Sequence, residues 1–168
     1  NLRDMTTKGV VVNSKGGRLY VYNSEIPNNK VYESPNITRV NSDNAIINAA
    51  INLKGSNTPF PGFNFTLSSG SFITNSGVDI NTDGGQANPG NGANGGNITL
   101  TAADYIAYAG AGKMSSAGAD MKTSGIGGNG GNITITAGKY IHGSTDEWKS
   151  SGGKGSTLGG SAGVISIT

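Results

Sequence analysis

Three acidic residues are the side chains of this chain that could together bind a metal ion. Asp79, Asp120 and Glu147 each stand before an apolar residue, and each is followed within a few residues by a glycine-rich stretch. If these segments align, the carboxylates lie in one file, where like charges repel unless a cation neutralises them. Ca²⁺ binds several carboxylate and carbonyl oxygens, so the alignment predicts a calcium site, with solvated, splayed side chains as the simpler alternative.

The composition argues against catalysis or metal binding by histidine and cysteine side chains. The 168 residues include one histidine, His142, and no cysteine, so His-based triads, clustered His ligands and thiol catalysis are nearly excluded. The ten acidic residues are dispersed along the chain. Asp146 and Glu147 are adjacent, but neighbours on a strand point to opposite faces and do not form a pair. We therefore predict no catalytic residue, no enzyme activity and no cofactor beyond the calcium ion.

Hydroxyl side chains recur two residues apart in short alternating segments. They are Thr66, Ser68, Thr99, Thr101, Thr134, Thr136, Ser166 and Thr168. Stacked segments would place them in two parallel rows on one flat face. Such Thr-x-Thr rows resemble the ice-binding face of β-helical antifreeze proteins, and the same rows could serve in assembly between copies. In the plainer interpretation, Thr is simply a favourable outward-facing strand residue.

Three aromatic residues occupy equivalent positions, and each is followed by isoleucine. Phe72, Tyr105 and Tyr140 each lie eight residues after an asparagine. We expect their rings to stack on one another inside the fold or at a corner, which contributes about 0.5–1.5 kcal/mol per pair beyond burial. A platform that contacts a glycan is the functional alternative.

The asparagines at the start of these units each open an Asn-x-Thr sequon. Glycans on adjacent ladder positions Asn64, Asn97 and Asn132 would collide, so full glycosylation is disfavoured. A ladder in which the side chains cap backbone groups explains the three residues better.

An internal repeat must position all of these residues. Asn64-Phe-Thr-Leu-Ser recurs as Asn97-Ile-Thr-Leu-Thr and Asn132-Ile-Thr-Ile-Thr, at offsets of 97 − 64 = 33 and 132 − 97 = 35, and a degenerate copy begins at Val164. The alternation of apolar and polar residues predicts half-buried strands. The 29 glycines cannot sit in helices, and we expect them at tight corners that need positive φ. The pattern predicts an all-β fold, a parallel β-solenoid (β-helix) of about four to five coils with glycine-rich corner loops. Phe65, Ile98, Ile133 and Ile165 should form one interior column.

The repeat region resembles a known family. Gly-Asn-Gly-Gly-Asn-Ile-Thr-Ile-Thr at 128–136, followed by Tyr140-Ile141 and a return rich in Ser and Gly, is similar to the coils of filamentous-haemagglutinin-type surface proteins. The resemblance covers about residues 62–168. It implies a secreted right-handed β-helix that acts as an adhesin or an extracellular stalk. Phage tail fibres use similar coils, which leaves a carbohydrate-binding or carbohydrate-cleaving fibre tip as an alternative.

Composition limits the remaining choices. Only 13% of residues are charged and the net charge is +2, with no basic stripe, so nucleic acid is not an expected partner. The longest apolar runs are a few residues long, which predicts no transmembrane segment. The chain starts at Asn1 without a visible signal peptide, as a processed product would. We expect an extracellular location, on a cell or virion surface.

The first third of the chain is less regular. Residues 1–61 form a strand-rich or capping region in this interpretation, continuous with the repeat region at 62–168. Segments 9–13 and 18–22 read as strands, either of a hairpin or of two sides of a coil. Asn36 opens a further degenerate copy of the repeat, and segment 43–53 favours strand slightly over a short capping helix.

The last residue, Thr168, falls within a predicted strand. An uncovered β edge invites pairing with another chain, so we expect a homo-oligomer or a filament, head to tail or lateral, with a surface glycan as a further partner. Fraying of the last coil is the plainer expectation.

Overall fold

The computed structural model describes part of the chain at two levels of detail. The backbone is described for residues 10–13, 18–21, 24–25, 37–47, 50–55, 60–86, 90–121, 123–144 and 147–168. Side chains are described from Ala45 onward within these ranges, Ser144 excepted. Predictions that fall on the remaining residues, such as the turn at 14–17, lie outside the described part of the chain.

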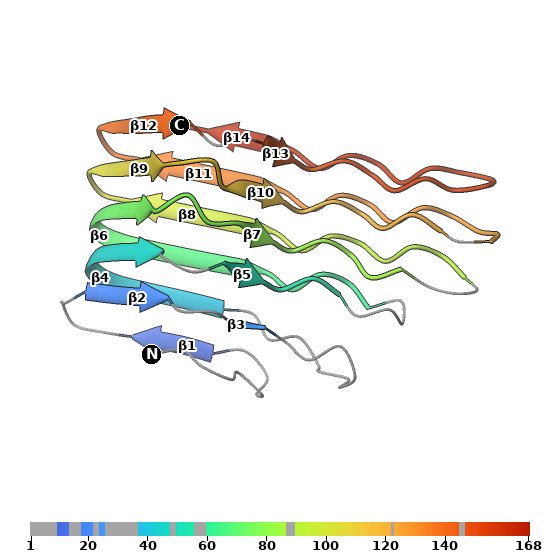
Figure 1. Ribbon diagram of the computed structural model, residues 1–168, viewed down its shortest axis with the longest axis horizontal. Helices are drawn as coiled ribbons and strands as arrows, with labels where there is room; N and C mark the ends of the chain where they lie inside the picture. The colour runs from blue at the N-terminus through green and yellow to red at the C-terminus, as the bar shows by residue number, and fades with distance from the viewer. Residues whose placement is uncertain are drawn as a thin grey trace.

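The described chain is an all-β parallel solenoid, as predicted (Figure 1). Successive coils stack one above the other, from β1 at one end to β14 at the other. One sheet of nine strands has the central order β1-β4-β6-β8-β11-β14, with β2, β9 and β12 beside it, and a second sheet has the order β13-β10-β7-β5-β3. About three turns are described fully. The expectation of four to five coils includes N-terminal coils that are described only in part.

The strands are short and their bounds follow the repeat. They are β1 (Val10–Asn13), β2 (Arg18–Val21), β3 (Ser24–Glu25), β4 (Ile37–Ile47), β5 (Ile51–Asn52), β6 (Phe65–Asn75), β7 (Ile80–Asn81), β8 (Ile98–Ala102), β9 (Tyr105–Ala109), β10 (Lys113–Ser115), β11 (Ile133–Ala137), β12 (Tyr140–Ser144), β13 (Glu147–Lys149) and β14 (Ile165–Ile167). No helix among the described residues is long and apolar enough to cross a lipid bilayer.

The predicted column is confirmed in its register, and three of its four residues are buried, whereas Ile165 is 40% exposed. Phe65 pairs with Ile98, Ile98 with Ile133, and Ile133 with Ile165, all in parallel register. Phe65, Ile98 and Ile133 are 0–1% exposed, because the coil above and the coil below each cover them. The second buried file, Leu67, Leu100 and Ile135, runs beside the first. Full burial of each such side chain stabilises the fold by about 1.5–3 kcal/mol.

The N-terminal strands belong to the same two sheets. β1 and β2 both pair with β4 in parallel, which supports the interpretation as two sides of a coil rather than a hairpin. Ile37 pairs with Phe65, so the copy that begins at Asn36 does open a coil. Segment 43–53 contains strand residues of β4 and β5, as the alternation favoured.

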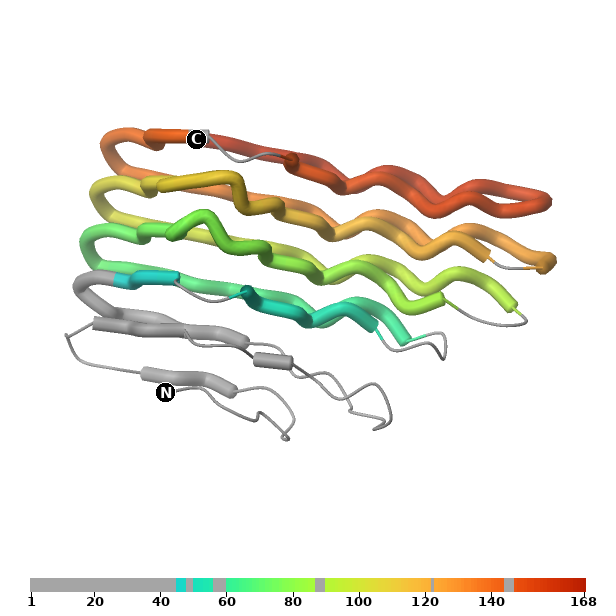
Figure 2. Tube along the Cα trace, in the orientation of Figure 1, coloured from blue at the N-terminus to red at the C-terminus, as the bar shows by residue number. Residues whose placement is uncertain are grey.

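The glycine-rich stretches are not corners, which corrects one expectation. They run outward from the sheets to a distant tip and back again, as stacked pairs of extended segments (Figure 2). We call these segments glycine limbs, outgoing at 82–86, 116–121 and 150–155, and returning at 60–64, 91–97, 126–132 and 158–164. Positive φ occurs at four described glycines only, Gly77, Gly90, Gly125 and Gly143.

The returning limbs have a hydrogen-bonding period of three. Within one period, the first N–H donates to a carbonyl of the next coil, the second to the outgoing limb of its own coil, and the third to an asparagine of the preceding coil. In the limb 126–132 these bonds are Gly130 N–H to Ser161 O at 2.8 Å, Gly131 N–H to Ser116 O at 2.7 Å and Asn132 N–H to Asn97 Oδ1 at 2.8 Å. Three residues per turn without internal hydrogen bonds is the geometry of a polyproline II helix. The limbs are therefore held by their neighbours.

Glycine is required where two limbs meet. A Cβ added to Gly128 would overlap the carbonyl oxygen of Ala93 in the preceding coil. A Cβ on Gly131 would likewise overlap the carbonyl oxygen of Gly96. The backbones approach so closely because no side chain lies between them. In this half of each coil, hydrogen bonds between backbones replace an apolar side-chain core.

Candidate functional site

The predicted file of three carboxylates does not form. Asp79 shares its register position with Lys113, because Ile80 pairs with Met114, and Lys113 pairs directly with Glu147. Asp120 lies farther along the outgoing limb. The alignment of Asp79, Asp120 and Glu147 was therefore wrong, and a lysine separates the two acids that do share a file. Lys113 Nζ lies 3.8 Å from Glu147 Oε2, so the repulsion that motivated a calcium ion is absent.

These carboxylates instead hold backbone groups of the following coil. Asp79 Oδ1 accepts the Lys113 N–H at 2.8 Å, and Asp120 Oδ1 accepts the Lys154 N–H at 2.6 Å. Both bonds join residues 34 apart, one coil in this part of the repeat. The part of the chain that the structure describes contains no group of three acidic or imidazole side chains placed to hold a metal ion.

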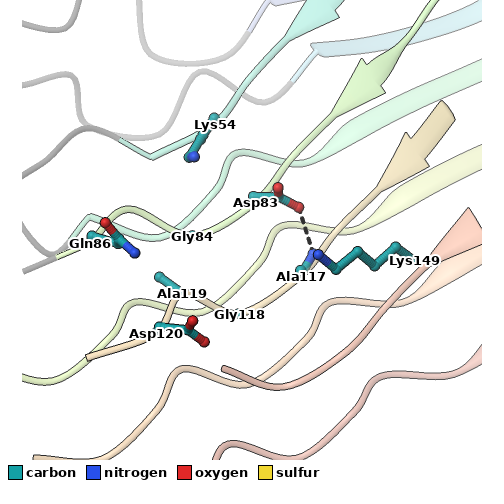
Figure 3. A pocket seen from close by; sticks show the side chains of 9 residues that line it. All are labelled: Lys54, Asp83, Gly84, Gln86, Ala117, Gly118, Ala119, Asp120 and Lys149. Carbon is teal, nitrogen blue, oxygen red and sulfur yellow. Dashed lines mark hydrogen bonds between the residues drawn. The ribbon is translucent and has the colours of Figure 1, made fainter. Parts of the chain in front are cut away.

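A shallow pocket on the outgoing limbs is lined by side chains of both charge signs (Figure 3). Its charged lining consists of Lys54, Asp83, Asp120 and Lys149, drawn from several coils. Asp83 Oδ1 accepts hydrogen bonds from the Ser115 hydroxyl at 2.5 Å and from the Ala117 N–H at 2.7 Å. This carboxylate therefore connects its coil to the next one. The pocket is an electrically mixed surface built around coil-to-coil contacts.

The two hydroxyl rows are present as predicted. Thr66, Thr99, Thr134 and Ser166 share one register position, and Ser68, Thr101 and Thr136 share the next outward position. Thr168 joins the second row, since its hydroxyl lies 3.3 Å from that of Thr136. Successive members of a row are about 4.8 Å apart, the spacing between paired strands. The rows form a flat, regular hydroxyl surface.

The aromatic residues also stack as predicted. The ring centroids of Phe72 and Tyr105 are 5.1 Å apart, with planes at 7°, and those of Tyr105 and Tyr140 are 5.2 Å apart at 3°. Tyr105 therefore has a ring against each of its faces. A sugar ring that binds an aromatic side chain needs an open ring face, and Tyr140, at the end of this stack, is 54% exposed. Contact of these residues with a glycan stays a prediction.

A polar file lies immediately beside the rings. Asp104 Oδ1 lies 2.7 Å from Lys139 Nζ, and Asp104 Oδ2 accepts the Ser71 hydroxyl at 2.9 Å. The hydrogen bond from Lys139, assisted by that from Ser71, lowers the pKa of the Asp104 carboxyl below its ordinary value. The same contact raises the pKa of Lys139. This partly exposed file links three coils at the turn that joins β8 to β9 and β11 to β12, which we call the narrow corner.

The asparagine ladder is confirmed, and it is longer than predicted. Asn64 Oδ1 accepts the Asn97 N–H at 2.7 Å, and Asn97 Oδ1 accepts the Asn132 N–H at 2.8 Å. A second file, not foreseen from the sequence, runs from Asn94 Oδ1 to the Asn129 N–H, and Asn129 Oδ1 in turn accepts a backbone N–H of the following coil. The sequence signal was an asparagine at every third residue, which matches a helix of three residues per turn.

No protein family, no characterised protein and no solved structure matches the chain significantly. Of the resemblance noted in the sequence, the structure confirms the parallel β-helix fold and not the filamentous-haemagglutinin-type family.

Proposed function

We propose that the chain is a non-enzymatic structural or adhesive module of an extracellular fibre on a cell or virion surface, in the manner of filamentous-haemagglutinin-type β-helices. The observation that carries this proposal is the coil stack, in which side chains, asparagine amides and glycine backbones all bind the coil above. Contacts between neighbouring repeats make such a stack a rod with fixed lateral faces. A stalk or an adhesin needs a rod of this kind.

Exposure at the last coil supports assembly. Ile133 and Ile135 are fully buried, whereas Ile165 and Ile167, which continue the same two files, are 40% and 52% exposed. A further layer of strands on β14 would cover both residues and pair its open edge. A second copy of this chain stacked on this end would supply that layer.

The strand order favours head-to-tail stacking. β1 and β14 lie at opposite ends of the same parallel sheet, and Val10 holds the backbone register position that Ile165 holds at the other end. A second copy placed with β1 on β14 would continue the sheet without a change of direction. A contact of this type repeats without closing, so it produces filaments.

Electron microscopy and sedimentation of the purified 168-residue chain test the proposal. We expect filaments whose length increases with concentration, and their loss in Ile165→Lys with Ile167→Lys, which places charges on the apolar files. Ala103→Lys, at an exposed position of an inner coil between β8 and β9, is the matched control and should assemble normally. A chain that stays monomeric at high concentration, or filaments unaffected by the double substitution, would show that this end is not an assembly surface.

A further inference from the structure

Charge is distributed unequally between the two sides of each coil. Segments 60–69, 90–102, 123–137 and 155–168 form the returning limbs with the strands that follow them, and they contain no Asp, Glu, Lys, Arg or His. The charged residues described from Lys54 onward lie instead on the outgoing limbs or the equivalent segment at Lys54, on or directly before β7, β10 and β13, or at the narrow corner. From residue 60 onward, the described part of the solenoid therefore has one uncharged side and one side of mixed charge.

Amides and hydroxyls form in-register files on the uncharged side, which we call the amide–hydroxyl face. Its residues are Asn64, Asn91, Asn94, Asn97, Asn129 and Asn132, followed along the strands by Thr66, Ser68, Thr99, Thr101, Thr134, Thr136, Ser166 and Thr168. Files repeat at about 4.8 Å along the stack and at about 6.7 Å along a strand. Along a limb, a period of three residues spans about 9 Å. The polar groups thus form a two-dimensional lattice.

The amides on this face are held in one orientation. Asn97 and Asn132 use Oδ1 to accept a backbone N–H of the following coil, at 2.8 and 2.9 Å. Both side chains are exposed, and within the described residues no group accepts a hydrogen bond from their Nδ2. Asn97 and Asn132 therefore each offer two Nδ2 hydrogens outward, with the orientation of the amide already fixed. Fixed donors lose little conformational entropy when a ligand binds.

We propose that the amide–hydroxyl face binds a neutral polysaccharide lying across the files, a proposal that rests on the adhesive role inferred above. Outward-facing donors require a partner rich in acceptors, such as sugar hydroxyl and ether oxygens. The uncharged surface gives an anionic polymer no electrostatic attraction, whereas the described lysines lie on the other side or at the narrow corner. Many equivalent weak contacts in register suit a polymer of repeated units, whose binding gains from multivalency.

Two alternatives fit the face less well. A protein partner usually needs buried aromatic or arginine anchors, and the residues of this face include neither. The aromatic stack is a weaker sugar platform, because Tyr105, its central ring, has both faces covered.

Binding of the full chain to microcrystalline cellulose, to chitin and to dextran tests the inference, with alginate as the anionic comparison. We expect binding to at least one neutral polymer, little effect of salt, and no preference for alginate. Thr99→Val with Thr134→Val removes two hydroxyls from one row without changing side-chain shape. Asn97→Asp with Asn129→Asp keeps the acceptor oxygen for the next coil and removes the donors. Loss of the hydrogen bonds should weaken binding about tenfold or more in each double variant.

Two control variants test whether the polysaccharide binds at the amide–hydroxyl face. Asp120→Asn, on the opposite side, keeps an acceptor for the Lys154 N–H and should bind as the unmodified chain does. Tyr140→Ala should also bind normally. The inference is overturned if no neutral polymer binds, if the face variants bind normally, if Tyr140→Ala alone abolishes binding, or if the face produces thermal hysteresis in ice without binding sugar. Filament formation is scored separately, so filaments without polysaccharide binding would overturn this inference and leave the assembly proposal intact.

Discussion

The two halves of each coil reach the same stacking distance by different means. In the strand half, β-branched and aromatic side chains fill the space between the sheets, and residues such as Ile98 and Ile133 are completely buried. In the glycine half, the limbs of successive coils touch through their backbones, as at Gly128 and Ala93. One half is stabilised by the removal of apolar surface from water and the other by hydrogen bonds between peptide groups.

This difference shows what each half can tolerate. The strand half contains apolar volume, so it is sensitive to loss of atoms. The glycine half has no space beside its backbone, so it is sensitive to added atoms. Both halves are tied to the next coil at the same axial interval, which makes the stack continuous from the narrow corner to the tip (Figure 2).

The largest expected effect is a cavity in the strand half. Ile98→Ala removes a fully buried side chain between Phe65 and Ile133, and it should lower the free energy of unfolding by about 4 kcal/mol. Ile165→Ala, in the same file but 40% exposed, should cost about 1 kcal/mol. Urea unfolding of both variants measures the contrast. Equal losses would mean that the file is not covered as described.

One added methyl group in the glycine half should have nearly as large an effect. Gly128→Ala places a Cβ against the carbonyl oxygen of Ala93, and it should lower the free energy of unfolding by about 2–3 kcal/mol. Gly159→Ala is the matched control, since its added Cβ would be 3.5 Å from the nearest atom, the Gly153 carbonyl oxygen. That variant should unfold like the unmodified chain. If both substitutions were harmless, the limbs would not be in backbone contact.

A lost asparagine should have a moderate effect. Asn97→Ala removes the acceptor of the Asn132 N–H at an exposed position, and it should lower the free energy of unfolding by about 1 kcal/mol. Asn97→Asp keeps an oxygen in the same place and should restore part of the loss. The same denaturation assay tests the pair, and an aspartate variant weaker than the alanine variant would argue against the ladder as the cause.

The smallest expected effect is a pH dependence at the corner. The Asp104 pKa is depressed in the fold, so its contribution to stability is complete above its unfolded pKa and is lost as the pH falls through the lower, folded pKa. Unfolding midpoints measured from pH 7 down to the acid range should therefore fall less steeply in Asp104→Asn than in the unmodified chain. Identical profiles would show that the contact with Lys139 is fully screened by solvent.

The strand half could be predicted because two independent sequence signals mark its repeat. The asparagine before each first strand and the aromatic residue eight positions later agree in three coils, so the register of Phe65, Ile98 and Ile133 followed directly. The Asp120 alignment failed because the spacing was ignored. Residues one coil apart there are separated by 113 − 79 = 34 positions, whereas 120 − 79 = 41.

The glycine half was harder to predict because glycine has no side chain to mark a face. Glycine runs usually indicate positive φ and tight turns, so we did not predict that the glycine limbs are extended. The exposed asparagine at every third residue was the available signal, and a period of three was not among the helix and strand periods considered. Backbone packing of this kind produces almost no hydrophobic pattern in the amino-acid sequence.

The asparagine files also bear on chemical ageing. An asparagine followed by glycine is the dipeptide most prone to spontaneous deamidation, in which the glycine nitrogen attacks the side-chain carbonyl carbon to close a succinimide ring. At Asn94-Gly95 both reacting groups are engaged by the next coil, since Gly95 N–H donates to Asn129 O and Asn94 Oδ1 accepts the Asn129 N–H, each at 2.8 Å. Ring closure would have to break both bonds at once, so the folded rod protects the sequence that would otherwise decay first.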